Sequence, residues 1–309
     1  MNANGKPNIS QAGRPLLKDW TVGVSISDSP DLQQLGMGGV HLQDALVEFA
    51  RYLLACGASL AYGGDLRKKG FTEILFDLVE THNLSGVQPF NRIVNFLAWP
   101  IHLRLTDEQQ AELKRVADFH PIGPPDDLGL DTIKAVDPDS TPNRYIWARC
   151  LTAMREEMNA LTHARLFLGG EYQPGKYLGK YPGLVEEASL ALRDKKPVFL
   201  MGGFGGCTKA IIDALVGDQT EVLTAAFQMS DSGYADLVEL YNERIPELSD
   251  PTQGPVDYEE LVRFFRSQGI EGLNNGLGEA DNQRLFETPY IPEMISLVLK
   301  GLTRLSKHG

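Results

Sequence analysis

Residues 164–170 read ARLFLGG, and residues 196–206 read KPVFLMGGFGG. Each segment is a short run rich in apolar residues that ends in a pair of glycines. Such runs are typical of strands buried in a sheet, and glycines at their ends favour tight turns into a following helix. The two segments therefore predict buried strands, each followed by a glycine-rich loop.

Strands and helices alternate over the first two thirds of the chain. We expect strands at residues 21–26, 58–62, 92–99, 117–122, 164–168 and 196–201, and helices at residues 40–56, 70–80, 106–116, 143–161, 183–193 and 207–216. Apolar residues recur at helical spacing in the first of these helices, at Leu42, Leu46 and Phe49. The alternation predicts an α/β protein with a Rossmann-like parallel sheet flanked by helices.

The patterning also divides the chain into parts. Residues 1–19 are polar and are expected to be flexible, whereas residues 20–217 carry the α/β alternation. Residues 218–309 are mostly helical, and we expect them to form a C-terminal extension packed on the α/β domain. The loop-rich residues 123–141 are interpreted either as a lid or as a plain surface excursion.

Composition limits the partners and the compartment. The chain has 309 residues, 3 cysteines and a formal net charge of −12 at pH 7. A negative surface repels polyanions, so we expect no nucleic-acid partner and no anionic membrane partner. Few cysteines and the absence of a long apolar run indicate a reduced, cytoplasmic protein. The scattered histidines predict no metal site, and the sequence implies no cofactor.

Three glycine pairs define the candidate binding site. They are Gly63 and Gly64, Gly169 and Gly170, and Gly202 and Gly203, and each pair follows a predicted strand. Such loops share the carboxyl edge of a parallel sheet, where ligands bind, and N–H groups at the start of the next helix attract phosphate. The other predicted ligand-binding residues are Ser25, Ser27, Asp28, Asp65, Gly183 and Phe204. The alternative is that the glycines only form tight turns.

Several enzyme classes are disfavoured by missing motifs. No G-x-G-x-x-G follows the first predicted strand, and no Gly-Lys-Ser/Thr follows a glycine run. The G-x-S-x-G elbow of serine hydrolases is absent too. Hydride transfer, ATP hydrolysis and Ser-His-Asp hydrolysis are therefore not expected.

Two motifs give the chain a resemblance to a known family. Residues 60–64, LAYGG, are followed by Gly70 and a predicted helix, which resembles the YGG element of the SLOG superfamily. That superfamily includes the Lonely guy phosphoribohydrolases, the DprA/Smf proteins and the ligand-sensing regions of TRPM channels. Its second hallmark is a PGGxGTxxE loop that follows a helix carrying an arginine. Arg155, residues 164–170 and residues 183–187 (GLVEE) are similar to that arrangement.

The chain departs from the second hallmark at three points. No proline precedes Gly169, Leu184 replaces the threonine, and residues 171–182 are inserted within the motif. The resemblance covers roughly residues 20–216 and places Glu187 at the position of the family's acidic residue.

The resemblance implies two competing functions. In the first, the chain binds or senses a nucleotide or nucleotide-derived sugar phosphate, such as an ADP-ribose-like molecule, and signals through a partner or its own homo-oligomer. In the second, it is an N-glycosidase of the phosphoribohydrolase type, or a deoxyribosyltransferase-like enzyme, with Glu187 and Arg155 as catalytic residues. Without catalysis, Glu187 is a helix-start acid and Arg155 belongs to a solvated helix face. The departures favour binding or sensing.

Overall fold

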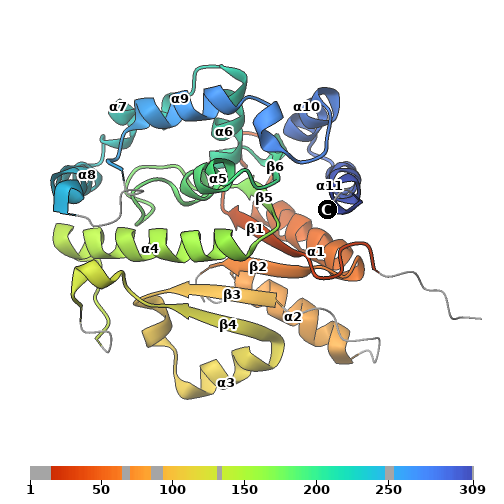
Figure 1. The fold of residues 1–309 in the computed structure, drawn as a ribbon, viewed down its shortest axis with the longest axis horizontal. Coiled ribbons are helices and arrows are strands. Elements are labelled where there is room, and N and C mark those ends of the chain that lie inside the picture. The colour runs from red at the N-terminus through yellow and green to blue at the C-terminus, as the bar shows by residue number, and fades with distance from the viewer. Residues whose placement is uncertain (1–14, 65–69, 85–92, 131–133, 248–253, 308–309) are drawn as a thin grey trace, which may run out of the picture.

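A single parallel sheet organises the molecule in the computed structural model, which describes residues 15–64, 70–84, 93–130, 134–247 and 254–307 (Figure 1). The strands are β1 (Thr21–Ser27), β2 (Ser59–Gly63), β3 (Ile93–Ala98), β4 (Ala117–Ile122), β5 (Ala164–Gly169) and β6 (Val198–Met201). They lie in the order β4-β3-β2-β1-β5-β6, and every neighbouring pair is parallel. The strand order reverses between β1 and β5, which are hydrogen-bonded neighbours.

Helices cover both faces of this sheet. The longer ones are α1 (Gly39–Ala55), α2 (Phe71–Leu84), α3 (Asp107–Val116), α4 (Thr141–Leu161), α5 (Gly183–Arg193), α6 (Gly206–Val216), α8 (Ser232–Arg244), α9 (Tyr258–Gln268), α10 (Glu279–Glu287) and α11 (Ile291–Ser306), and α7 (Ala225–Gln228) is a single turn. The Rossmann-like α/β fold with helices after the last strand is therefore confirmed.

The core lies in layers on the two faces. On one face Val22, Val24 and Leu166 pack with residues of α1, α10 and α11. On the other, Phe167 and Leu200 pack with residues of α5, α6, α8 and α9. All residues of β5 are buried. A strand covered on both faces has no need for polar alternation, which is why this segment reads as a nearly continuous apolar run.

The C-terminal helices complete the sheet at its β6 edge. Figure 1 shows α10 beside β6 and α11 beside α1, and both pairs are in contact. Asn275 is buried, and its Nδ2 donates to the carbonyl oxygen of Val198 at 2.9 Å. An edge strand presents unpaired backbone groups, so this contact protects part of β6 from pairing with another chain.

The inserted residues 171–182 are tied to the C-terminal helices by buried phenols. Tyr234 Oη lies 2.6 Å from Tyr258 Oη and donates to the carbonyl oxygen of Lys180 at 2.6 Å. Tyr177 Oη donates to Gln228 Oε1 at 2.6 Å. Burial raises the pKa of Tyr177, Tyr234 and Tyr258. The insertion is therefore an ordered part of the fold, held by neutral phenols.

The described part of residues 123–141 packs along α4. Trp147 Nε1 donates to the carbonyl oxygen of Val136 at 2.7 Å, and Arg149 Nη2 lies 3.0 Å from Asp127 Oδ1. These contacts hold the segment as a surface excursion against the helix.

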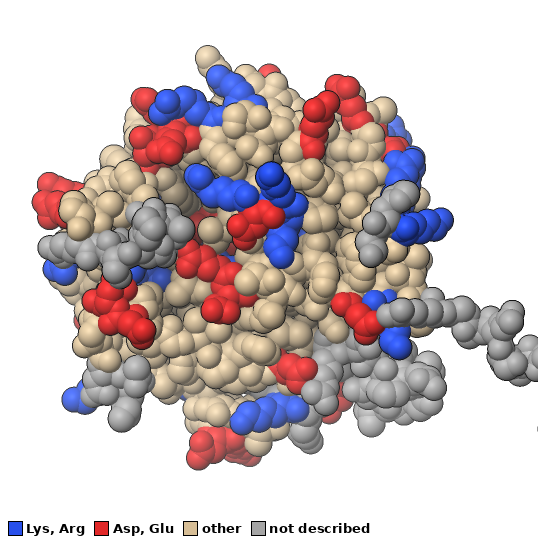
Figure 2. All heavy atoms as spheres, viewed as in Figure 1, with Lys and Arg blue, Asp and Glu red and all other residues tan. Residues whose placement is uncertain are grey.

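The charged surface is mixed. On the face seen in Figure 2, Lys and Arg side chains are interspersed with Asp and Glu side chains. No described helix combines the length and the apolar character that crossing a membrane requires.

Candidate functional site

The three glycine pairs follow strands that end at one edge of the sheet. Gly63 ends β2, Gly169 ends β5, and Gly202 follows β6 directly. Because these strands are all parallel, their carboxyl ends point the same way, as the sequence predicts. Ligands usually bind to such sheets where the strand order reverses, and here the order reverses between β1 and β5.

Hydrogen bonds join the chain segments that follow β1 and β5. Ser27 is paired in register with Gly169, and its carbonyl oxygen accepts from Gly170 N at 3.1 Å. Ser27 Oγ also accepts from Glu171 N at 3.2 Å. Asp28, the next residue after β1, is exposed. Of these predicted residues, Ser27 therefore holds the loops together, while Asp28 faces solvent.

The second glycine loop is filled by protein atoms. Gly170 has φ +111°, and a Cβ there would lie 2.6 Å from Cys207 Cβ. Gly206 has φ +68°, and its Cβ would lie 2.5 Å from the carbonyl oxygen of Gly170. Close packing between the loops after β5 and β6 thus explains these glycines without a ligand.

The C-terminal helices cover the third glycine loop. A Cβ on Gly202 would lie 2.2 Å from the carbonyl oxygen of Phe286, and one on Gly203 would lie 2.2 Å from that of Thr288. Phe204 is 1% exposed and belongs to the hydrophobic core. Direct contact between a ligand and Gly202 or Phe204 would require the covering segment to move, whereas Gly203 is partly exposed.

The first glycine loop borders residues that the structure leaves undescribed. A Cβ on Gly63 would lie 3.0 Å from Met154 Sδ, so β2 packs closely on α4 here. Gly64 is partly exposed. Asp65, which the sequence also places in the site, lies outside the described residues.

Glu187 belongs to a buried ion network. Its Oε2 accepts from Ser25 Oγ at 2.6 Å and pairs with Arg165 Nη2 at 2.5 Å, while its Oε1 lies 3.6 Å from Arg155 Nε. Arg165 Nη2 also donates to Ser25 Oγ at 2.7 Å. Glu187 is 5% exposed and Arg165 is fully buried. The carboxylate therefore points into the core beneath β1 and β5.

Burial disfavours the charged form of Arg165 and lowers the pKa of its guanidinium, and the Glu187 carboxylate opposes this effect. A guanidinium remains protonated because its ordinary pKa is above 12. Gly23 provides the necessary space, since a Cβ there would lie 2.6 Å from Arg165 Cδ.

A neighbouring pair joins Glu186 to Arg155. Glu186 Oε2 pairs with Arg155 Nη1, and Glu186 Oε1 accepts from Thr152 Oγ1 at 2.5 Å. Arg155 Nη2 lies beside the start of α5, only 3.0 Å from where a Cβ on Gly183 would be. Arg155 is 7% exposed, so it is not part of a solvated helix face.

The chemistry open to Glu187 follows from this network. A general acid, base or nucleophile must come within hydrogen-bond reach of the substrate. Glu187 instead directs one oxygen to Ser25 and Arg165 and the other toward Arg155. The structure thus brings Glu187 and Arg155 together but orients the carboxylate toward Ser25 of β1 and Arg165 of β5.

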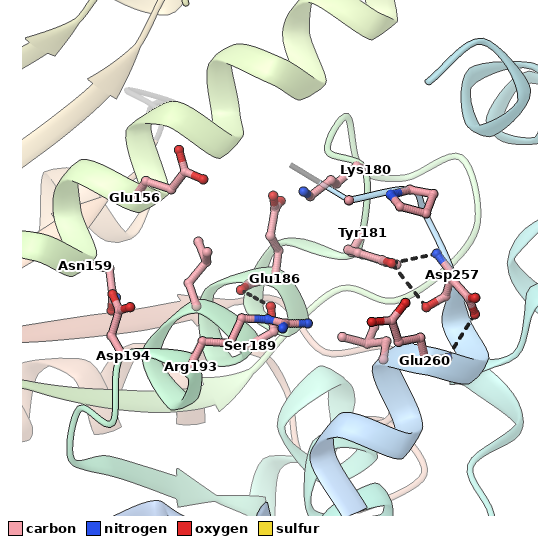
Figure 3. Close-up of a pocket in the computed structure, with 14 residues that line it drawn as sticks. Glu156, Asn159, Lys180, Tyr181, Glu186, Ser189, Arg193, Asp194, Asp257 and Glu260 are labelled. Atoms are coloured by element: carbon pink, nitrogen blue, oxygen red, sulfur yellow. Dashed lines mark hydrogen bonds between the residues drawn. The ribbon is translucent and has the colours of Figure 1, made fainter. Parts of the chain in front are cut away.

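A cavity of about 490 Å³ lies between α4, α5 and the start of α9 (Figure 3). Its charged lining consists of the carboxylates of Glu156, Glu186, Asp194, Asp257 and Glu260 and the cations of Lys180 and Arg193. Tyr181 reaches into it and accepts from Asp257 N at 2.8 Å. None of the predicted site residues that the structure describes lines this cavity.

No group of three or more His, Cys, Asp or Glu side chains is placed to hold a metal ion in the described part of the chain.

Sequence reasoning missed Arg165 and Asp31. A charge within the apolar segment ARLFLGG was the available signal for Arg165, because a buried charge requires a partner. Asp31 Oδ2 accepts from Gly206 N at 2.7 Å, across 175 residues of sequence. No local pattern predicts a contact of that separation.

Comparison with known proteins gives one family match. A model of the family described as SLOG cluster2 matches residues 16–285. Among solved structures, the chain is similar to the X-ray structure of the structural-genomics target TM1055, with 16% sequence identity and a TM-score of 0.37 over 65% of this chain and 86% of that chain. Comparison with curated proteins gives no match.

Proposed function

Since the chain belongs to the SLOG family, in its cluster2 group, we propose that it binds a nucleotide or nucleotide-derived sugar phosphate at the carboxyl edge of its sheet, without turning it over. The observation that carries the proposal is the orientation of Glu187. Its carboxylate lies in a buried network with Ser25 and Arg165, which gives it a structural role. The ligand that we propose is an ADP-ribose-like molecule, which the site would bind without cleaving it.

The start of α5 is the place we propose for a phosphate group. The helix begins after Pro182 with no side chain capping its first N–H groups. Arg155 lies beside Gly183 at this end. The positive end of the helix dipole favours an anion there, and Arg155, which also pairs with Glu186, adds a guanidinium.

The cavity of Figure 3 suits a phosphate less well. Five of its seven charged lining residues are acidic, so a phosphate entering it would meet like charge. We therefore assign the anionic part of the ligand to the α5 start.

A titration panel tests the proposed function. Nucleoside monophosphates, ADP-ribose and NAD are added to the wild-type protein, and thermal stability and binding heat are measured. A ligand that binds the native state stabilises it by mass action, so at least one member of the panel should raise the melting temperature. If none binds, the proposal is wrong.

A matched pair of variants tests whether the phosphate group of the ligand binds at the α5 start. Arg155→Lys keeps the charge but loses the planar fork of donors, and we expect about tenfold weaker binding. Arg193→Lys makes the same chemical change on an exposed residue lining the acidic cavity, and binding should stay unchanged. Equal effects of the two substitutions would place the phosphate elsewhere.

The competing proposal is N-glycoside cleavage by Glu187. One contact favours it, the 3.6 Å between Glu187 Oε1 and Arg155 Nε, which matches the arginine and acid of the family resemblance. Incubation with purine and pyrimidine nucleoside monophosphates should release no free base. If wild type does release base and Glu187→Gln does not, the catalytic proposal replaces the binding proposal.

A further inference from the structure

The carboxylate of Asp31 occupies the N-terminus of α6. Asp31 Oδ2 accepts from Gly206 N at 2.7 Å, and Gly206 is the first residue of that 11-residue helix. The preceding residue, Gly205, has no side chain that could cap the helix. The carboxylate thus takes the position at which a helix start attracts an anion.

The second carboxylate oxygen is held from the inserted segment. Tyr172 Oη donates to Asp31 Oδ1 at 2.6 Å. Burial, together with the hydrogen bond and negative charge of Asp31, raises the pKa of Tyr172, so the phenol stays a neutral donor. Asp31 N also donates to Ser29 Oγ at 3.3 Å. Asp31 is therefore fixed by three loops, those following β1, β5 and β6.

The backbone around Asp31 is shaped to admit it. Gly205 has φ +66°, and a Cβ there would lie only 2.6 Å from Asp31 Cβ. The next donor of the helix start, Cys207 N, is taken by the carbonyl oxygen of Gly170 at 3.0 Å. A phosphate at this position would have to displace Asp31 and would meet its negative charge.

We propose that Asp31 is a specificity-determining residue, which makes the α6 start reject phosphate and confines the anionic group of the ligand to the α5 start. The claim that the anionic group of the ligand is confined to the α5 start rests on the proposed function. A phosphate-rejecting α6 start narrows the ligand class to molecules that place no phosphate there. Molecules that would bridge the α5 and α6 starts with two anionic groups are excluded.

The test uses inorganic phosphate as the probe, which separates it from any result with nucleotides. Asp31→Ala removes the carboxylate and clears the position, and its phosphate affinity by calorimetry should exceed that of wild type by about tenfold. Asp44→Ala is the matched control, because it makes the same charge change on an exposed residue of α1. Its phosphate affinity should equal that of wild type.

One further variant keeps the result decisive. Asp31→Asn retains an oxygen that can accept from Gly206 N, so it preserves the cap while removing the charge. If Asp31→Ala does not fold, any gain in phosphate affinity for Asp31→Asn over wild type supports the proposal. A folded Asp31→Ala that binds phosphate no better than wild type overturns it, as does an unchanged Asp31→Asn when the alanine variant cannot be measured.

Discussion

The connections from β5 to α5 and from β6 to α6 both run from a strand through glycines to a helix start, yet different charged side chains lie at the two starts. At the α5 start the nearest guanidinium is that of Arg155, beside Gly183. At the α6 start the N–H of Gly206 is already bound to Asp31. Similar glycine patterns can thus produce one helix start that lies beside an arginine and another that is capped by an aspartate.

The two connections also differ in what closes them. The β5–α5 connection is long, and buried tyrosines anchor its inserted residues to the C-terminal helices. The β6–α6 connection is short and lies beneath Phe286 and Thr288. Protein atoms therefore fill space that a glycine pattern alone would assign to a ligand.

Replacing Arg165 should reduce the stability of the fold more than the other changes, because its guanidinium pairs with the buried carboxylate of Glu187 on α5. Arg165→Met leaves the Glu187 carboxylate without its closest cation, and we expect the free energy of unfolding to fall by about 3–5 kcal/mol. Urea denaturation measures it. The double variant Arg165→Met, Glu187→Met should lose less, since no buried carboxylate is left unpaired. A single-variant loss below about 1 kcal/mol would contradict a structural role for this pair.

A substitution at Gly206 tests the junction of the two connections. Gly206→Ala places a side chain at φ +68° and against the carbonyl oxygen of Gly170, so we expect a loss of about 1–3 kcal/mol or more from backbone strain and contact. Gly39→Ala is the control, because its Cβ would meet nothing within 4 Å and its φ is not positive. Equal stability of the two variants would show that the junction is loose.

High pH should lower the stability of the protein through the buried tyrosines that anchor the β5–α5 connection. The buried phenols Tyr177, Tyr234 and Tyr258 have raised pKa values in the folded state, whereas an unfolded tyrosine titrates near pH 10. Above that pH the unfolded state releases phenolic protons that the folded state retains, so stability falls as pH rises. The urea concentration at the midpoint of unfolding should decrease as the pH is raised above 10. Tyr258→Phe should reduce the dependence, and an unchanged slope in that variant would rule out its contribution.

The smallest expected effect is in the labelling of the buried cysteines, which involves no change in the stability of the protein. Burial raises the pKa of the Cys150 thiol to about 12 and also raises that of Cys207. Cys207 lies at the junction, with its Sγ 3.1 Å from the carbonyl oxygen of Glu171. Both thiols should react with Ellman's reagent at pH 8 only after denaturation. Rapid labelling of native Cys207 would mean that the β6–α6 connection opens readily.

The sequence predicts the sheet well because its strands and helix starts are marked by local patterns. The predicted strand at residues 117–122 and helix at residues 183–193 coincide with β4 and α5. The filling of the glycine loops depends instead on distant residues, Asp31 against Gly206 and Phe286 against Gly202. The sequence leaves open whether Arg155 is a catalytic residue or part of a solvated helix face, and its pairing with Glu186 buries it. The ligand-binding residues, the boundary after residue 217 and the homo-oligomer stay predictions.

The cover over the third glycine loop also sets an order for biosynthesis. Phe286 follows Gly202 by 84 residues in the chain. At about 5–20 residues per second, a ribosome makes the loop on the order of 4 to 17 seconds before it makes the cover. For most of that interval β6 lacks both the residues above its loop and the amide of Asn275 on Val198, so its edge is open to pairing with other nascent chains.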